Sequence, residues 1–159
     1  MKRLLTLTAV GALLAAPAMA DTLRIGLATA QTGGLATYDS PVIEGIHIAV
    51  DEINAAGGIG GKTLIELIEK DVRSDAAQTS IAAQELVDAG VSVLVLPCDA
   101  DPSLAAIGIV SSAQIPAIST CASSPTLPMI GGDYMFANFP GDNVQATVSA
   151  TWAREQGHD

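Results

Sequence analysis

Short apolar segments alternate with amphipathic segments along most of this 159-residue chain. The apolar segments have the length and composition of strands, and the amphipathic segments repeat their apolar residues at helical spacing. The expected strands span 23–29, 63–69, 91–96, 117–119 and 134–139, and the expected helices span 41–56, 76–89, 102–113 and 143–156. This order predicts an α/β fold, an open parallel sheet with right-handed crossovers and helices on both faces.

Local signals set the expected boundaries. Ser40 can cap a helix whose first residue is Pro41, and Gly57-Gly58 would end that helix. Val91–Leu96 is a continuous apolar run, which is typical of a strand buried on both faces of a parallel sheet. We therefore expect this run to form a central strand.

Ligands of open parallel sheets bind beyond the carboxyl ends of the strands, where the strand order reverses. In this chain the loops that follow the first four strands would form that edge, and they hold most of the small hydroxyl side chains and unexplained acids. These rim loops span 30–39, 71–74, 97–101 and 120–124. The sequence therefore predicts a binding site at one end of the sheet.

Several rim residues are candidates for contact with a small solute. Tyr38 lies in the first rim loop, where an aromatic ring can close over a ligand and still hydrogen-bond through its hydroxyl. Asp101 is expected to cap the helix that Pro102 opens, which leaves Asp99 free to face the cleft and accept hydrogen bonds from an amine or amide. Hydroxyls suited to a polar solute follow the fourth strand, although solvation alone would also explain them: Ser119, Thr120, Ser123 and Ser124.

The two cysteines occupy matching positions in neighbouring rim loops. Cys98 follows the third strand and Cys121 follows the fourth, and adjacent strands lie about 4.8 Å apart. This spacing is compatible with a disulfide that would clamp two ligand-facing loops in an oxidising compartment. Two buried, unlinked thiols are the alternative.

The first twenty residues differ from the rest of the chain. Lys2 and Arg3 precede an apolar run and the ending Ala18-Met19-Ala20, a pattern typical of a secretory signal peptide over residues 1–20. An uncleaved anchor is the alternative. The chain carries a net charge of −10, and loss of Lys2 and Arg3 with the leader would make it two units more negative. Such a charge disfavours nucleic-acid and membrane-surface partners.

Other kinds of site are not supported by the sequence. The glycine-rich stretch 57–61 follows a helix and precedes a strand, whereas a phosphate-binding loop needs the opposite order. His47 and His158 have no metal-ligand spacing to other candidate ligands, and neither cysteine has a nearby His to act as a base. We therefore expect no metal, no cofactor and no enzymatic activity.

Two stretches resemble the branched-chain amino-acid-binding family of periplasmic receptors, which supply ABC transporters. The stretch 45–62, GIHIAVDEINAAGGIGGK, is similar to the signature after that family's first helix. The stretch Ile115–Ser119, followed by Ser123-Ser124-Pro125, is similar to the region of its fourth strand. The resemblance covers nearly all of residues 23–157, and it implies the type I periplasmic binding protein fold.

Members of that family have two lobes that close on a ligand. The resemblance implies an N-terminal lobe over 21–138, and over 139–159 a crossover and the first helix of a second, truncated lobe. Because the pattern would require another strand where the sequence ends at Asp159, we expect the last helix to expose Val148 and Trp152.

The resemblance also implies roles for individual residues. Tyr38 corresponds to a ligand-covering tyrosine, Asp99 stands where a serine commonly holds a ligand carboxylate, and Cys121 and Ser123 match an alanine and a threonine. An acid beside a ligand carboxylate would repel it by about 1 kcal/mol even when well solvated, which disfavours a leucine-like ligand. The usual partner of Cys98 is replaced by Ser74, which leaves Cys121 as the available mate. The expected ligand-binding set is Tyr38, Asp99, Ala100, Cys121, Ala122 and Ser123.

These expectations combine into one functional hypothesis. The protein would be a monomeric substrate-binding component of an ABC transporter, located in the periplasm, that captures a small polar solute such as an amino acid or an amide and delivers it to a permease. A ligand-sensing receptor or regulator that uses the same fold is the alternative.

Overall fold

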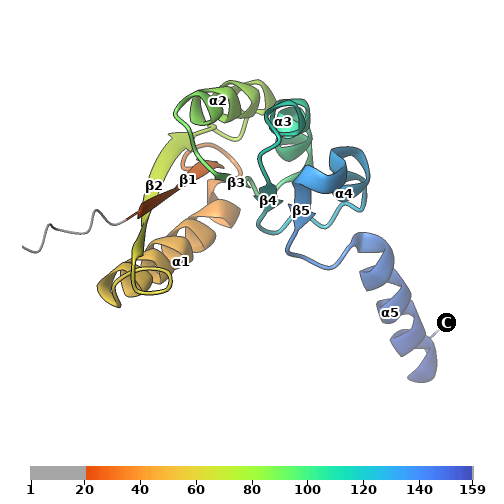
Figure 1. The fold of residues 1–159 in the computed structure, drawn as a ribbon. Helices are drawn as coiled ribbons and strands as arrows, with labels where there is room; N and C mark the ends of the chain where they lie inside the picture. Colours follow the sequence, from red (N-terminus) through yellow and green to blue (C-terminus); the bar gives the residue numbers. More distant parts are fainter. Residues whose placement is uncertain (1–20, 159) are drawn as a thin grey trace, which may run out of the picture.

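The computed structural model describes residues 21–158, and the expected signal peptide lies outside them. A single sheet of five parallel strands organises the chain, in the order β2-β1-β3-β4-β5 (Figure 1). The strands are β1 (Asp21–Thr29), β2 (Thr63–Asp71), β3 (Val93–Leu96), β4 (Ala117–Ser119) and β5 (Met135–Ala137). The predicted parallel sheet is confirmed.

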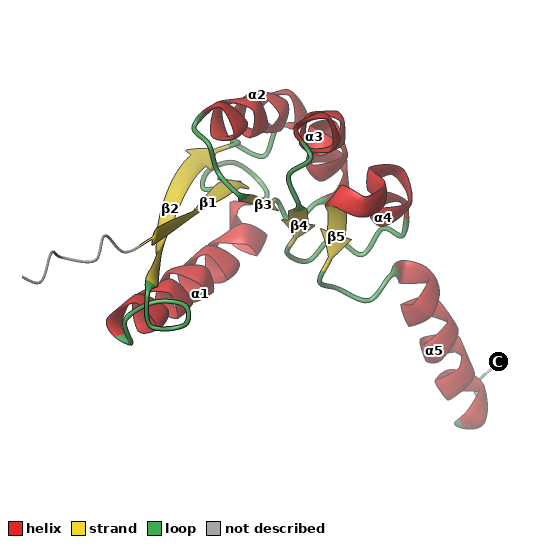
Figure 2. Ribbon diagram, in the orientation of Figure 1, coloured by secondary structure: helices red, strands yellow, loops and turns green. Residues whose placement is uncertain are grey.

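Helices cover both faces of this sheet. They are α1 (Ala36–Ala55), α2 (Ala76–Asp88), α3 (Ala100–Ala113), α4 (Thr126–Gly131) and α5 (Asp142–Glu155), with a 3₁₀ turn, η1 (Gly132–Tyr134). In Figure 2, α1 lies on one face of the sheet, and α2 and α3 lie on the other. The expected α/β architecture is thus confirmed.

The main core lies between the sheet and the layer of α2 and α3. It consists almost entirely of aliphatic side chains, including Leu86 of α2, Leu94 and Leu96 of β3, and Val110 of α3. Gly26 of β1 allows the close approach of α2, because a Cβ there would lie 3.2 Å from side-chain atoms of Leu86. This core is filled by small and branched aliphatic residues, in keeping with the low aromatic content of the chain.

The first helix starts earlier than the sequence predicts. It begins at Ala36, so that Pro41 lies inside it and Tyr38 and Asp39 belong to its first turn rather than to a loop. The amides of Tyr38 and Asp39 donate to the Leu35 carbonyl at 2.9 and 3.2 Å. These hydrogen bonds and the burial of the Asp39 side chain stabilise the extra turn. They do so although Pro41 has no amide hydrogen to donate within the helix.

The last helix projects away from the sheet, as Figure 1 shows. None of its residues is buried, and Val148 and Trp152 are 63% and 60% exposed. The exposure of these two side chains agrees with the expectation. Within residues 21–158, no helix combines the length and hydrophobicity needed to cross a membrane.

Candidate functional site

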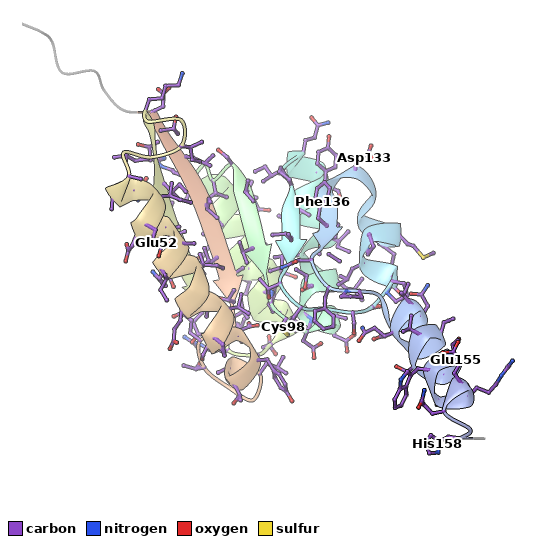
Figure 3. All side chains as sticks on the ribbon, turned by 90° about the horizontal axis from the view of Figure 1, so that it is seen from below. Glu52, Cys98, Asp133, Phe136, Glu155 and His158 are labelled. Carbon is purple, nitrogen blue, oxygen red and sulfur yellow. A yellow bond between two sulfur atoms is a disulfide. The ribbon has the colours of Figure 1, made fainter. Side chains whose placement is uncertain are left out.

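The carboxyl ends of all five strands point to the same edge of the sheet. Figure 3 shows Cys98 at that edge, just beyond β3, and Asp133 at the opposite edge. β1 lies between β2 and β3. The connection from β1 to β2 therefore crosses the sheet toward one side, and the connection from β2 to β3 crosses it toward the other side. The point where the strand order reverses is therefore beside the ends of β1 and β3, where open α/β sheets place their ligands.

The loop after β1 is fixed to the end of β2 by Asp71. Its carboxylate accepts hydrogen bonds from the backbone amides of Gln31 (3.0 Å) and Thr32 (3.1 Å), from the Thr32 hydroxyl (2.6 Å) and from the Arg73 amide (2.9 Å). Although desolvation opposes ionisation, these hydrogen bonds hold the pKa of Asp71 below its usual value. The carboxylate thus serves as a fixed anchor for the first rim loop.

Ser74 adds a second connection to the same loop. Its hydroxyl accepts from the Leu35 amide at 2.9 Å and donates to the Thr32 carbonyl at 3.0 Å. A Cβ at Gly33, whose φ is +88°, would lie 2.6 Å from the Ser74 hydroxyl oxygen, so this close approach requires glycine. Ser74, which stands where the family resemblance places a cysteine, therefore binds the first loop through hydrogen bonds.

A cavity of about 310 Å³ opens at the point where the strand order reverses. Leu35 and Tyr38 line it from the side of β1 and α1, and Cys98 and Asp99 line it from the side of β3 and α3. The Tyr38 side chain is 63% exposed, so its ring is accessible to a solute. The structure brings together two of the predicted ligand-binding residues, Tyr38 and Asp99, around one cavity.

Asp99 is also the N-cap of α3, and the expectation that Asp101 has this role is wrong. The Asp99 carboxylate accepts a hydrogen bond from the Asp101 amide at 3.0 Å. The helix begins at Ala100, two residues before Pro102, so the capping position falls on Asp99. Ala100, the third residue of the predicted set in this loop, is the first residue of the helix and is half-buried.

Cys98 and Cys121 form a disulfide, with their Cα atoms 4.5 Å apart. The bond joins the loops that follow β3 and β4. The Pro97 carbonyl strengthens this connection, because it accepts from the hydroxyls of Ser119 (2.8 Å) and Ser103 (2.9 Å). The third and fourth rim loops are therefore held together by one covalent bond and by the hydrogen bond from buried Ser119, while buried Ser103 ties the third loop to α3.

A second cavity, of about 370 Å³, lies beside the loop after β4. Ala122 and Ser123 line it, together with the aromatic side chains of Phe136 and Phe139. Ala122 is almost fully buried, and the Ser123 carbonyl accepts from the Asp142 amide at 2.8 Å, which ties this loop to the start of α5. Four of the six predicted residues thus divide between two cavities, and the disulfide connects the loops beside them, whereas Ala100 and Cys121 line neither cavity.

Asp39 has a role at this edge that sequence reasoning missed. Asp39 is 1% exposed, and its carboxylate oxygens Oδ2 and Oδ1 accept hydrogen bonds from the amides of Ala30 (2.6 Å) and Cys98 (2.8 Å), respectively. Burial raises the pKa of Asp39 and the charge of Asp99 adds to this, whereas the two amide hydrogen bonds oppose it. The spacing of Asp39 with Ile43, Ile46 and Val50 was the available signal, because it places the acid on the sheet-facing stripe of α1.

Within residues 21–158, no three His, Cys, Asp or Glu side chains are grouped as metal ligands would be. His47 Nε2 instead lies 2.9 Å from a Glu69 carboxylate oxygen, and neither residue lines either cavity.

Comparison with known proteins identifies the family of this chain. A family model described as periplasmic binding protein matches residues 22–159. The Leu/Ile/Val-binding protein BraC3 of Rhizobium johnstonii is 30% identical over 156 residues, which cover 98% of this chain and 42% of that protein. The chain thus spans about two fifths of the length of this curated relative.

Solved structures agree with this assignment. The branched-chain amino acid transporter substrate-binding protein LivJ of Streptococcus pneumoniae, in complex with isoleucine, matches with a TM-score of 0.72 and 37% identity over 77% of this chain and 35% of that one. A solute-binding protein of an ABC transporter from Rhodopseudomonas palustris, in complex with 3,4-dihydroxybenzoic acid, matches with a TM-score of 0.67 and 27% identity over 76% of this chain and 32% of that one. The chain belongs to the periplasmic binding protein family and has its type I fold.

Proposed function

We propose that this chain forms the ligand-binding N-terminal lobe of a receptor that captures a small polar solute in the periplasm and delivers it to an ABC transporter permease. The observation that carries this proposal is the cavity between Tyr38 and Asp99, located where the strand order reverses. Membership of the periplasmic binding protein family supports it. The mechanism is closure around an unaltered solute, by a monomeric protein without cofactor or metal.

Each predicted residue has a distinct task in this proposal. Tyr38 covers the solute, and Asp99 accepts hydrogen bonds from it. Ser123 contributes its hydroxyl from the neighbouring loop, and the remaining members of the set, Ala100, Cys121 and Ala122, supply backbone and shape. Residues 21–138 form the first lobe, and residues 139–159, which include α5, lead into a second lobe that closes over the rim.

The charge of the site constrains the class of solute. The solved relatives bind isoleucine in one case and an aromatic acid in another, so similar structures accept different solutes. In this chain the Asp99 carboxylate caps the N-terminus of α3. It therefore occupies the place where the dipole of the helix would favour an anionic group of the solute. We therefore propose that the solute presents a hydrogen-bond donor, such as an amine or amide, to Asp99.

A calorimetric screen of the full-length protein against amino acids, amides, urea and polyols tests the proposed function. We expect one chemical class to bind, to be recovered unaltered by chromatography, and to lose affinity when Tyr38→Ala removes the covering ring. Glu52→Ala, on the exposed side of α1 and distant from the cavity lining, is the matched control and should leave the affinity unchanged. Binding that is insensitive to Tyr38→Ala, or conversion of the solute into a product, would contradict the proposal.

A further inference from the structure

Asp39 is the buried group that connects the two sides of the Tyr38–Asp99 cavity. Its two carboxylate oxygens accept hydrogen bonds from residues 68 positions apart in sequence, namely Ala30 after β1 (2.6 Å) and Cys98 after β3 (2.8 Å). Tyr38 precedes Asp39 in the chain, and Asp99 follows Cys98. Asp39 is thus bonded to Tyr38 in the chain, and its carboxylate binds the residue before Asp99. Tyr38 and Asp99 line opposite sides of the cavity.

No cation neutralises this carboxylate among the described residues. The ion pairs in that part of the chain are Arg24–Glu66, His47–Glu69 and Lys70–Glu85, and none includes Asp39. The charged group that acts on it is Asp99, which is also negative. A buried carboxylate held by two backbone amides alone is sensitive to protonation, because the added proton removes the charge that strengthens both hydrogen bonds and makes the protonated oxygen a poorer acceptor for its amide.

We propose that Asp39 is a positioning residue of the solute site, which in its ionised form fixes the distance between Tyr38 and Asp99 by holding the ends of β1 and β3 together. Protonation of Asp39 weakens its hydrogen bond to one of the two amides and lets the sides of the cavity move apart. The inference rests on the proposed function in one respect, that Tyr38 and Asp99 contact the solute. The linkage itself is independent of any solute.

The test is a pH titration of the protein by nuclear magnetic resonance, with protons themselves as the probe and no solute present. We expect the amide signals of Ala30 and Cys98 to shift with one common midpoint, which lies above the ordinary aspartate value of 3.8 because Asp39 is buried. The ring signals of Tyr38 should follow the same midpoint. A role in stability alone would not couple these three signals to one titration.

Two variants make the result specific. Asp39→Asn keeps the shape of the side chain but offers one acceptor oxygen, so the common titration step should disappear, and one of the two amides should exchange its hydrogen at least tenfold faster. Asp75→Asn is the matched control, because Asp75 also accepts from a backbone amide, that of Gln78 at 2.8 Å, but at the start of α2. It should leave the step unchanged.

Each outcome separates this inference from the proposed function. If the wild-type signals of Ala30, Cys98 and Tyr38 do not share a midpoint, the role proposed for Asp39 is contradicted, and the proposed function in solute binding still stands. If they share a midpoint that persists in Asp39→Asn, the role is also wrong. If the step is present and specific to Asp39 but the calorimetric screen finds no solute, the linkage holds and the proposed function fails. An Asp39→Asn protein that does not fold leaves the wild-type titration to decide.

Discussion

At the scale of single residues, Asp99 joins a structural task to a proposed binding task. It caps α3 through the Asp101 amide and also lines the cavity beside Tyr38. These tasks can be separated, because serine is as good an N-cap as aspartate but carries no charge. The substitution Asp99→Ser therefore removes the negative charge from the cavity without removing the cap.

We expect Asp99→Ser to shift the preference of the full-length protein toward solutes with a free carboxylate. Loss of the like-charge repulsion should improve their binding by about 1 kcal/mol. Competition calorimetry with matched pairs of amino acids and their amides measures this shift. Asp101→Ser, which changes the charge of an exposed residue next to the cap, is the control, and an unchanged ranking of solutes in Asp99→Ser would show that Asp99 does not face the ligand.

Sequence reasoning at this scale found residues that lie at strand ends and missed residues that act through the backbone. Tyr38 and Asp99 could be assigned to the cavity edge because the carboxyl ends of parallel strands meet there. Asp39 and Asp71 could not be assigned their roles, because these depend on the distant backbone amides of Cys98 and Gln31, which only the folded sheet brings near. The choice between Asp99 and Asp101 as the cap depended on a helix boundary that shifted by two residues.

At the scale of elements, the bounds of the predicted strands and helices agree with the structure to within two residues, except for the start of α1. The fourth strand, 117–119, has the predicted bounds, because Pro116 and the polar loop after it limit its length. The start of α1 was placed too late because Ser40-Pro41 is a strong local signal, which the buried contacts of Asp39 override. The helix α4 was missed, since its six residues lie partly in a stretch rich in Ser, Thr and Pro.

The turn between α1 and β2 gives a prediction at this scale. Gly58 and Gly60 both have positive φ, but a Cβ at Gly58 would lie 2.3 Å from the Thr63 carbonyl oxygen, whereas a Cβ at Gly60 meets no atom within 4 Å. We expect Gly60→Ala to lower the free energy of unfolding by about 1 kcal/mol, from the left-handed backbone alone. Gly58→Ala should lower it clearly more, as measured by urea unfolding, and equal effects would show that the turn relaxes without strain.

At the scale of the whole molecule, the disulfide connects two of the four rim loops. Cys98 and Cys121 are separated by 23 residues, and the chain-entropy estimate for a loop of this size is about 3 kcal/mol of stability. Dithiothreitol should therefore lower the thermal unfolding midpoint of the wild-type protein. The double variant Cys98→Ser/Cys121→Ser should unfold at the lower midpoint both with and without dithiothreitol. A wild-type midpoint that does not change on addition of the reductant would contradict this contribution of the disulfide.

We propose that the solute binds at the carboxyl edge of the sheet. Hydrogen-exchange mass spectrometry of the full-length protein, with and without the solute selected by calorimetry, tests it most directly. We predict that the solute protects segments 30–39, 97–101 and 120–124, and leaves the opposite edge, 56–62, 114–116 and 132–134, unchanged. Protection confined to the opposite edge, with the rim loops exchanging as before, would contradict the claim.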